Sequence, residues 1–173
     1  MPHVIEPATS GRSQCRGCGR KIERGELRFG ERRENDFGEG EMTLWFHPLC
    51  AAYKRPEALL ELLATQSVES AEDLRVAAQR GVDHERLPRL SGAERSPTGR
   101  ASCRSCRKPI EKDAWRLTLS FFEEIRFNAG GFIHAGCAQE YFGTTEIMDR
   151  VRYFNPELTA EELHELARAM EPS

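Results

Sequence analysis

One ligand pattern occurs twice along this chain of 173 residues and limits what it can fold into. In each half, two cysteines with two residues between them are followed, after 28 or 27 further residues, by a histidine and a cysteine with the same spacing. The eight positions are Cys15, Cys18, His47 and Cys50 in the first half, and Cys103, Cys106, His134 and Cys137 in the second. Structural zinc sites commonly place three cysteines and one histidine around the metal. Because every cysteine is used and the set occurs twice, the sequence predicts two structural Zn²⁺ ions.

Other uses of these cysteines fit the sequence less well. Six cysteines could form three disulfides in a secreted protein. The N-terminus, however, has neither the basic start nor the apolar core of a signal peptide. A catalytic zinc keeps an open position, usually beside a base, whereas each set here supplies four closed ligands. The Cys-x2-Cys pairs also lack the βαβ context of a thioredoxin-like redox motif.

The sequence also indicates where in the cell the protein is found. No apolar run approaches the roughly 20 residues that a membrane span needs. We therefore expect a soluble protein, cytoplasmic and nucleoid-associated in a bacterium or nuclear in a eukaryote. Arg outnumbers Lys by 21 to 4, a bias that favours a GC-rich, bacterial genome.

The repeat extends beyond the ligands. Residues 10–18 match residues 98–106 at an offset of 88, and residues 47–50 match residues 134–137 at an offset of 87. We therefore predict two tandem modules, 8–86 and 98–171. The segment between them, 87–97, is polar, lacks periodicity and contains two prolines, so it is expected to be a linker. The hydrophobic core of a module of this size gives only marginal stability by itself. A bound zinc ion can supply the additional stabilisation.

Each module is expected to be a small α+β unit, with a short antiparallel sheet followed by C-terminal helices. In the first module, residues 26–31 and 42–47 resemble strands joined by a glycine-bearing loop. In the second, the strands are expected near 114–122 and 131–134. Capping boxes at Ser70 and Thr159 predict the starts of the last helices, and Gly81 is expected to end the first of these.

The ligand pattern also brings a family into view. The order Gly-Arg-x2-Cys-x2-Cys, then a strand with Leu-Arg or Trp-Arg, then an aromatic residue before His-x2-Cys resembles the PARP-type zinc finger. Such fingers occur in tandem at the N-terminus of poly(ADP-ribose) polymerase and sense DNA breaks. The resemblance covers both modules, and it implies sequence-independent recognition of nicks, gaps and ends in DNA repair or damage signalling.

The resemblance also implies which residues contact DNA. By position, the arginines expected to hold phosphates are Arg12, Arg28, Arg100 and Arg116. The residues expected to stack on an exposed base pair are Phe37, Met42, Ile125 and Phe127. From the residues alone, Trp45 is expected to pack in the core near the zinc, whereas Phe37 could stack on a base or pack against its own loop.

Charge distribution supports a DNA-facing surface more than total charge does. The formal net charge is −3. Residues 10–35, however, hold eight basic and four acidic side chains, and residues 99–116 hold six basic and two acidic ones. Both Cys-x2-Cys segments therefore carry a net charge of +4, which suits contact with phosphates. Because the loop around Phe37 is acidic, through Glu34, Asp36, Glu39 and Glu41, we expect the second module to be the stronger DNA contact.

These observations leave two functional classes open. The first is a non-enzymatic protein that binds broken DNA and acts alone or with a repair enzyme. The polymerase's transferase domain is a separate unit, and only two residues, Pro172 and Ser173, follow the second module in this sequence. The alternative is a zinc-stabilised protein–protein adaptor that binds a partner through acidic helical faces. A metal-dependent or redox enzyme is disfavoured by the closed ligand sets.

Overall fold

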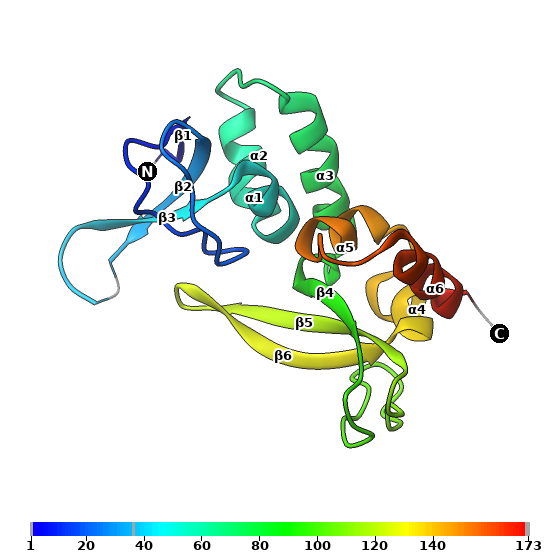
Figure 1. Cartoon of the computed structure of the whole chain (residues 1–173). Coiled ribbons are helices and arrows are strands. Elements are labelled where there is room, and N and C mark those ends of the chain that lie inside the picture. The colour runs from blue at the N-terminus through cyan, green and yellow to red at the C-terminus, as the bar shows by residue number, and fades with distance from the viewer. Residues whose placement is uncertain (1, 36, 172–173) are drawn as a thin grey trace. The chain divides into compact units, whose positions relative to one another are not determined.

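The computed structural model describes residues 2–35 and 37–171, which form two compact units (Figure 1). The units are Met1–Asp83 and His84–Ser173, called module one and module two below. Each contains a three-stranded antiparallel sheet, short helices and a cluster of three cysteines and one histidine. The predicted fold class, two tandem zinc-stabilised α+β modules, is confirmed.

Module one begins with its sheet and ends with its helices. The strands, in the order β1-β2-β3, are β1 (Val4–Pro7), β2 (Leu27–Glu34) and β3 (Glu41–Phe46). The helices are α1 (Pro48–Lys54), α2 (Pro56–Leu63) and α3 (Ala71–Asp83). Phe29 from β2, Leu44 and Phe46 from β3 and Leu59 from α2 are fully buried. The core therefore lies between one face of the sheet and the helices.

Module two repeats this plan with two short 3-10 turns added. Its sheet, in the order β4-β5-β6, consists of β4 (Leu90–Arg95), β5 (Trp115–Glu123) and β6 (Arg126–His134). The helical segments are η1 (Leu87–Arg89), η2 (Ala135–Cys137), α4 (Ala138–Phe142), α5 (Met148–Phe154) and α6 (Ala160–Met170). Leu117 and Ile133 from the sheet pack in one cluster with Val151 from α5 and Leu166 from α6.

The segment expected to be a linker, 87–97, is instead part of module two. It holds η1 and β4, and β4 pairs with β5 so that Glu94 lies opposite Arg116. In module one, β1 pairs with β2 in the same way and sets Glu6 opposite Arg28. Both edge strands escaped the sequence prediction because they are short and contain Pro, Gly or Ala, which have little intrinsic preference for strands.

Strands β2 and β6 are longer than predicted. The β2–β3 ladder runs from Phe29 opposite Phe46 to Glu34 opposite Glu41, so the loop shrinks to residues 35–40. In module two, β6 starts at Arg126 and passes through Gly130 and Gly131, where the register with β5 shifts. Two glycines in succession resemble a strand end in sequence, but here they form a bulge within the strand.

One of the two predicted capping boxes is present. Thr159 Oγ1 accepts a hydrogen bond from the Glu162 N–H at 3.1 Å, and Glu162 Oε1 accepts one from the Thr159 N–H at 3.0 Å. Ser70 instead has a left-handed φ of 61°, whereas an N-cap residue is extended. Helix α3 also continues beyond the buried Gly81 to Asp83, because a glycine inside a helix costs only about 1 kcal/mol.

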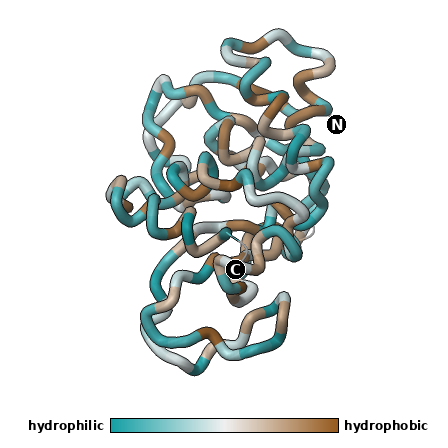
Figure 2. Tube along the Cα trace, turned by 90° about the vertical axis from the view of Figure 1, so that its right-hand side faces the viewer, coloured by the Kyte–Doolittle hydropathy of each residue, from teal (hydrophilic) through white to brown (hydrophobic). Residues whose placement is uncertain are grey.

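Apolar residues are dispersed along the chain in short stretches (Figure 2). Among the described residues, no helix is both long enough and apolar enough to cross a membrane.

Replacing Thr159 with alanine is expected to lower the free energy of unfolding of module two by about 1 kcal/mol, because the Glu162 N–H loses its acceptor. Denaturant unfolding of the full chain, followed by circular dichroism, measures this change. Ser67→Ala is the matched control, since the exposed Ser67 hydroxyl makes no hydrogen bond within the described residues. Equal stability of the two variants would contradict a stabilising role for the capping box.

Candidate metal centres and DNA-facing surfaces

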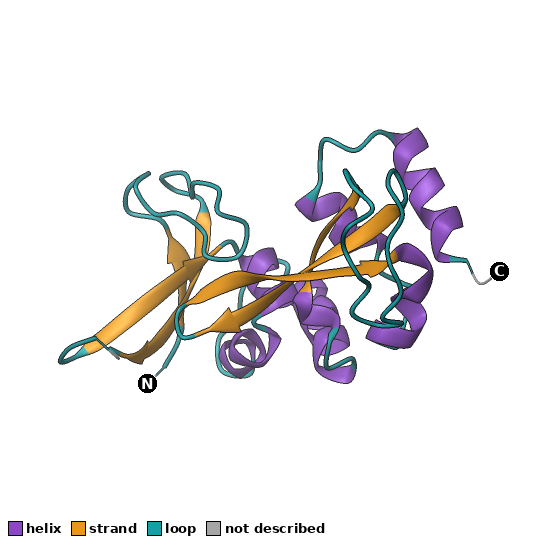
Figure 3. Cartoon of the chain, turned by 90° about the horizontal axis from the view of Figure 1, so that it is seen from below, coloured by secondary structure: helices purple, strands orange, loops and turns teal. Residues whose placement is uncertain are grey.

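Each metal centre joins a loop to the end of the sheet. The residues between β1 and β2, and between β4 and β5, are mostly loop (Figure 3), and the Cys-x2-Cys pairs lie there. The histidine stands at the end of β3 or β6, and the last cysteine lies in the following helical turn. In each set the four ligand atoms lie within 4.8 Å of one another.

The ligand atoms are spaced for a tetrahedral zinc ion. His47 Nδ1 is 3.4 Å from Cys18 Sγ and 3.8 Å from Cys50 Sγ. His134 Nδ1 is 3.3 Å from Cys106 Sγ and 3.8 Å from Cys137 Sγ. A tetrahedral zinc with ordinary Zn–S and Zn–N bonds holds its ligand atoms about 3.5–3.8 Å apart. Both clusters therefore fit structural zinc, as the sequence predicted.

Backbone amides support the first thiolate of each set. Cys15 Sγ accepts hydrogen bonds from the Gly17 and His47 N–H groups, both at 3.3 Å. Cys103 Sγ accepts equivalent bonds from Ser105 and His134, also at 3.3 Å. Cys15 and Cys103 are both buried, so water does not solvate their thiolates. The backbone N–H groups stabilise the negative charge instead.

Both histidines present Nδ1 to the metal, but the partner of the other ring nitrogen, Nε2, differs between the modules. His134 Nε2 lies 3.0 Å from the Pro109 carbonyl oxygen, to which it donates when Nδ1 binds zinc. His47 Nε2 lies 3.7 Å from Glu26 Oε1, so a carboxylate faces the ring in module one. Such outer partners fix the tautomer of a metal-bound histidine.

Protonation of these groups is coupled to metal binding. Without metal, hydrogen bonds that the ring donates to the Cys15 and Cys18 sulfurs raise the pKa of His47 to about 10, so its ring is protonated at neutral pH. Burial and the neighbouring thiolates Cys103 and Cys106 raise the pKa of Cys137 to about 12. Zinc binds neutral imidazole and thiolate. Zinc binding at neutral pH should therefore release protons from both sites.

Replacing Cys137 with serine is expected to lower the zinc content from two ions per chain to one and to unfold module two alone. The reason is that each ligand set closes within its own module, and metal binding and folding are coupled in small modules. Metal analysis gives the stoichiometry, and an amide NMR spectrum reports on each module. Cys50→Ser is the mirror control, which should unfold module one. Retention of two zinc ions and a native module two in the Cys137 variant would contradict this assignment.

A buried arginine lies against an aromatic ring at equivalent positions of both modules. The Arg28 guanidinium lies 3.6 Å from the Trp45 ring centroid, and Arg116 lies 3.5 Å from that of Phe132. Arg28 is 7% exposed and Arg116 6% exposed. Both arginines, predicted to grip phosphates, are thus held inside their modules.

Each of these arginines also has a carboxylate and a serine beside it. Glu6 lies 3.6 Å from Arg28 and Glu94 lies 2.9 Å from Arg116, each from the edge strand that the sequence did not reveal. Arg28 donates to Ser13 Oγ at 2.9 Å, and Arg116 donates to Ser96 Oγ at 3.3 Å. Their charge is therefore partly compensated before any ligand arrives.

The expectation that Trp45 packs in the core is wrong. Trp45 is half-buried, and its neighbour Phe46 is the fully buried ring. Adjacent residues of a strand point to opposite faces, so only one of the two can face the core. Trp45 instead lines a depression of about 550 Å³ together with Arg12, Arg16 and Thr43.

The other two arginines expected to contact phosphates, Arg12 and Arg100, are exposed, and their backbones make equivalent contacts in the two modules. Arg12 and Arg100 both lie on the surface of the loop that precedes the first cysteine. The Arg12 N–H lies 3.4 Å from Ser10 Oγ, and the Arg100 N–H lies 3.3 Å from Thr98 Oγ1. A hydroxyl two residues earlier thus shapes the turn in both modules.

The stacking candidates differ in accessibility. Phe37 is 67% exposed in the β2–β3 loop, so it does not pack against that loop. Met42 is half-buried on β3, and Ile125 is half-buried in the β5–β6 turn. Phe127 is half-buried and its ring centroid is 4.9 Å from that of Phe122.

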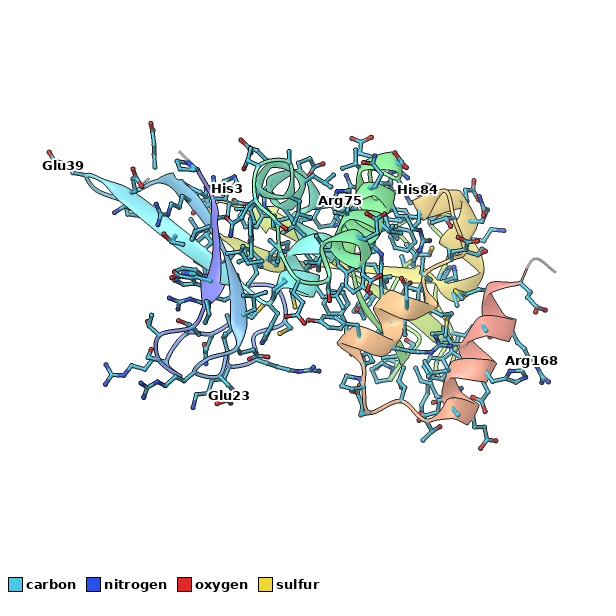
Figure 4. All side chains as sticks on the ribbon, turned by 90° about the horizontal axis from the view of Figure 1, so that it is seen from above. His3, Glu23, Glu39, Arg75, His84 and Arg168 are labelled. Atoms are coloured by element: carbon cyan, nitrogen blue, oxygen red, sulfur yellow. The ribbon has the colours of Figure 1, made fainter. Side chains whose placement is uncertain are left out.

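Acidic residues occur at both hairpin ends. Figure 4 shows Glu39 at the far end of the β2–β3 hairpin, close in sequence to Phe37; Asp36 lies outside the described residues. In module two, Glu123 and Glu124 are exposed beside Ile125, and Asn128 Nδ2 donates to Glu123 at 3.1 Å. Exposed carboxylates therefore lie beside the stacking candidates in both modules.

Together these features define a protein of two tandem zinc-stabilised modules, each with an exposed basic loop fixed to the end of a hairpin. Residues 6–85 match the family described as the poly(ADP-ribose) polymerase and DNA-ligase zinc-finger region. This match covers nearly all of the first module and confirms, for that module, the resemblance to PARP-type zinc fingers.

Relatives extend the similarity across both modules. The chain is 27% identical over 172 residues to a poly [ADP-ribose] polymerase of Sarcophaga peregrina, an alignment covering 86% of this chain and 17% of the relative. It is 26% identical over 149 residues to that of Drosophila melanogaster, covering 76% and 15%. A poly [ADP-ribose] polymerase 1 of Caenorhabditis elegans is 32% identical over 83 residues, covering 48% and 8%. The chain thus spans less than a fifth of the length of these relatives.

Proposed function

We propose that this protein binds DNA at strand breaks, without sequence specificity, through both zinc modules. The observation that carries the proposal is the repeated pairing of a zinc-fixed, exposed basic loop with a hairpin that bears apolar side chains. The family description, which names a polymerase and a ligase, supports DNA as the partner. Zinc has a structural role, because it fixes the loop against the end of the sheet.

Phosphate contact is assigned first to the exposed arginines. Arg12 and Arg16 line the depression beside Trp45, and a guanidinium there can donate two parallel hydrogen bonds to one phosphate. Arg100 occupies the position of Arg12 in module two. Arg28 and Arg116 lie behind these surfaces, where we propose that they add partly compensated positive charge and hold the aromatic ring in place.

Base stacking is assigned to the hairpins. A continuous duplex hides the faces of its base pairs, whereas a nick, gap or end exposes one. Phe37 is the accessible ring of module one, and stacking contributes about 1–3 kcal/mol per base. Met42 lies on the adjoining strand β3, while in module two Ile125 and the paired ring of Phe127 would form the equivalent apolar surface. Phosphate contacts would supply affinity and stacking would supply preference for breaks.

The proposed role is non-catalytic. Four protein ligands around each zinc leave no coordination position for a reactive water. The protein would mark or protect a break, or bring a repair enzyme to it, in the nucleoid or the nucleus. The adaptor hypothesis is retained as the alternative, with the acidic side chains of α6, Glu161, Glu162 and Glu165, as its contact surface.

The full chain is expected to bind nicked and gapped duplexes more tightly than an intact duplex of the same sequence. Affinity should fall as salt rises, with a log–log slope of about −0.9 per phosphate contacted. Fluorescence anisotropy at several salt concentrations measures both quantities. Arg12→Ala and Arg100→Ala should each reduce the slope, and the predicted dominance of module two requires the larger reduction from Arg100→Ala.

Each outcome separates the hypotheses. Equal affinity for all three duplexes would reduce the protein to a general DNA-binding protein. Absence of binding to any of them would favour the adaptor. A larger reduction from Arg12→Ala would reverse the ranking of the modules.

Replacing Phe37 with alanine should weaken binding to nicked DNA by about 1–3 kcal/mol while leaving the affinity for intact duplex unchanged, because stacking requires an exposed base pair. Val76→Ala is the matched control, since Val76 is 53% exposed on α3 of the same module. The same competition assay with nicked and intact duplexes measures the ratio. An unchanged ratio for the Phe37 variant would remove this residue from the site.

A further inference from the structure

Three arginines and two aromatic rings alternate along one surface of module two. The Arg86 guanidinium lies 4.9 Å from the Tyr141 ring centroid. Arg89 donates to Tyr141 Oη at 3.1 Å and lies 4.9 Å from the Phe121 ring centroid. The Arg104 guanidinium lies 5.4 Å from the same Phe121 ring. Arg86, Arg89 and Arg104 are called the arginine row below.

The fold builds this row from separate segments. Arg86 and Arg89 come from the segment around η1, Arg104 from the zinc loop, and the rings from β5 and α4. The glycine bulge of β6 makes room for it. A Cβ atom at Gly130 would lie 2.0 Å from the Phe121 ring, and one at Gly131 would lie 2.8 Å from Arg104 Nε.

The row is positively charged and lacks internal compensation. Arg95 and Arg116 of the same module pair with Glu165 and Glu94. Within the described residues, by contrast, no carboxylate pairs with any member of the row. Arg86 and Arg104 are exposed and Arg89 is half-buried, so their charge is available to a ligand.

The chemistry of the row favours phosphate. A guanidinium held near an aromatic ring loses less conformational freedom on binding, and it retains N–H groups that match the oxygens of a phosphate. The two rings already have arginines beside them, which makes them less suited to base stacking than the exposed Phe37. Several adjacent, uncompensated guanidiniums are the kind of surface that follows a nucleic-acid backbone.

We infer that the arginine row is a second phosphate-binding surface of module two, which contacts the DNA backbone separately from Arg100 and the hairpin. This inference rests on the proposed function. Because phosphates are the same in broken and intact DNA, the row contributes affinity and no preference for breaks. It also gives a physical reason for module two to be the stronger DNA contact.

The test is the full chain carrying Arg86→Gln together with Arg104→Gln. The salt slope on nicked duplex should fall by about 0.9 for each phosphate that the variant no longer binds, with roughly threefold weaker binding or more at moderate salt. The ratio of nicked to intact affinity should stay unchanged. Arg168→Gln, on the exposed face of α6, is the control for charge removal elsewhere in the module and should alter neither quantity.

Zinc content and thermal unfolding of each variant establish that the module remains folded. If the double variant is folded and has the affinity and salt slope of the wild type, the arginine row does not bind phosphate. This result would leave the proposed DNA binding by the chain unaffected. Failure of the wild type to bind any duplex would instead overturn the proposed function. A double variant that binds DNA normally but no longer binds polyglutamate would reassign the row to an acidic protein partner and likewise overturn the inference.

Discussion

Coordination of zinc by one loop and one strand end is the constraint on which each module depends. The loop that carries Cys-x2-Cys has little regular structure of its own, and the strand that ends at the histidine belongs to a sheet of only three strands. Four metal bonds join the two parts more firmly than the small core could. The position of every exposed arginine in the loop is thereby set relative to the hairpin.

A second feature shared by the modules is the contact between an inner-strand arginine and an aromatic ring of the neighbouring strand. In each module the edge strand adds a glutamate to this pair, so three strands are linked on the face away from the core. A buried guanidinium needs both partners, because an uncompensated buried charge is costly. In each module, the glutamate of β1 or β4 therefore supplies this carboxylate partner.

The ligand sets, the fold class and the final helix were predictable because they depend on local patterns. Cysteine spacing specifies a zinc loop, and Thr159 with Glu162 specifies a helix start. The edge strands β1 and β4 were not predictable, since they are defined by pairing with residues 20 to 29 positions away in sequence. The face of the sheet on which Trp45 lies could not be predicted with certainty. Successive residues of a strand point to opposite faces, so an error of one position exchanges Trp45 with Phe46.

Roles of individual charged residues were the least predictable part of the site. The charge counts over residues 10–35 and 99–116 treat Arg28 and Arg116 as free positive charges. Glu6 and Glu94 lie outside these segments, and strand pairing brings them next to the two arginines. The two glutamates act as counterions supplied by the protein itself. A phosphate that approaches Arg28 or Arg116 must compete with a carboxylate already there, and few dissolved ions are displaced in the exchange. The electrostatic valence of each module is therefore smaller than its number of basic residues.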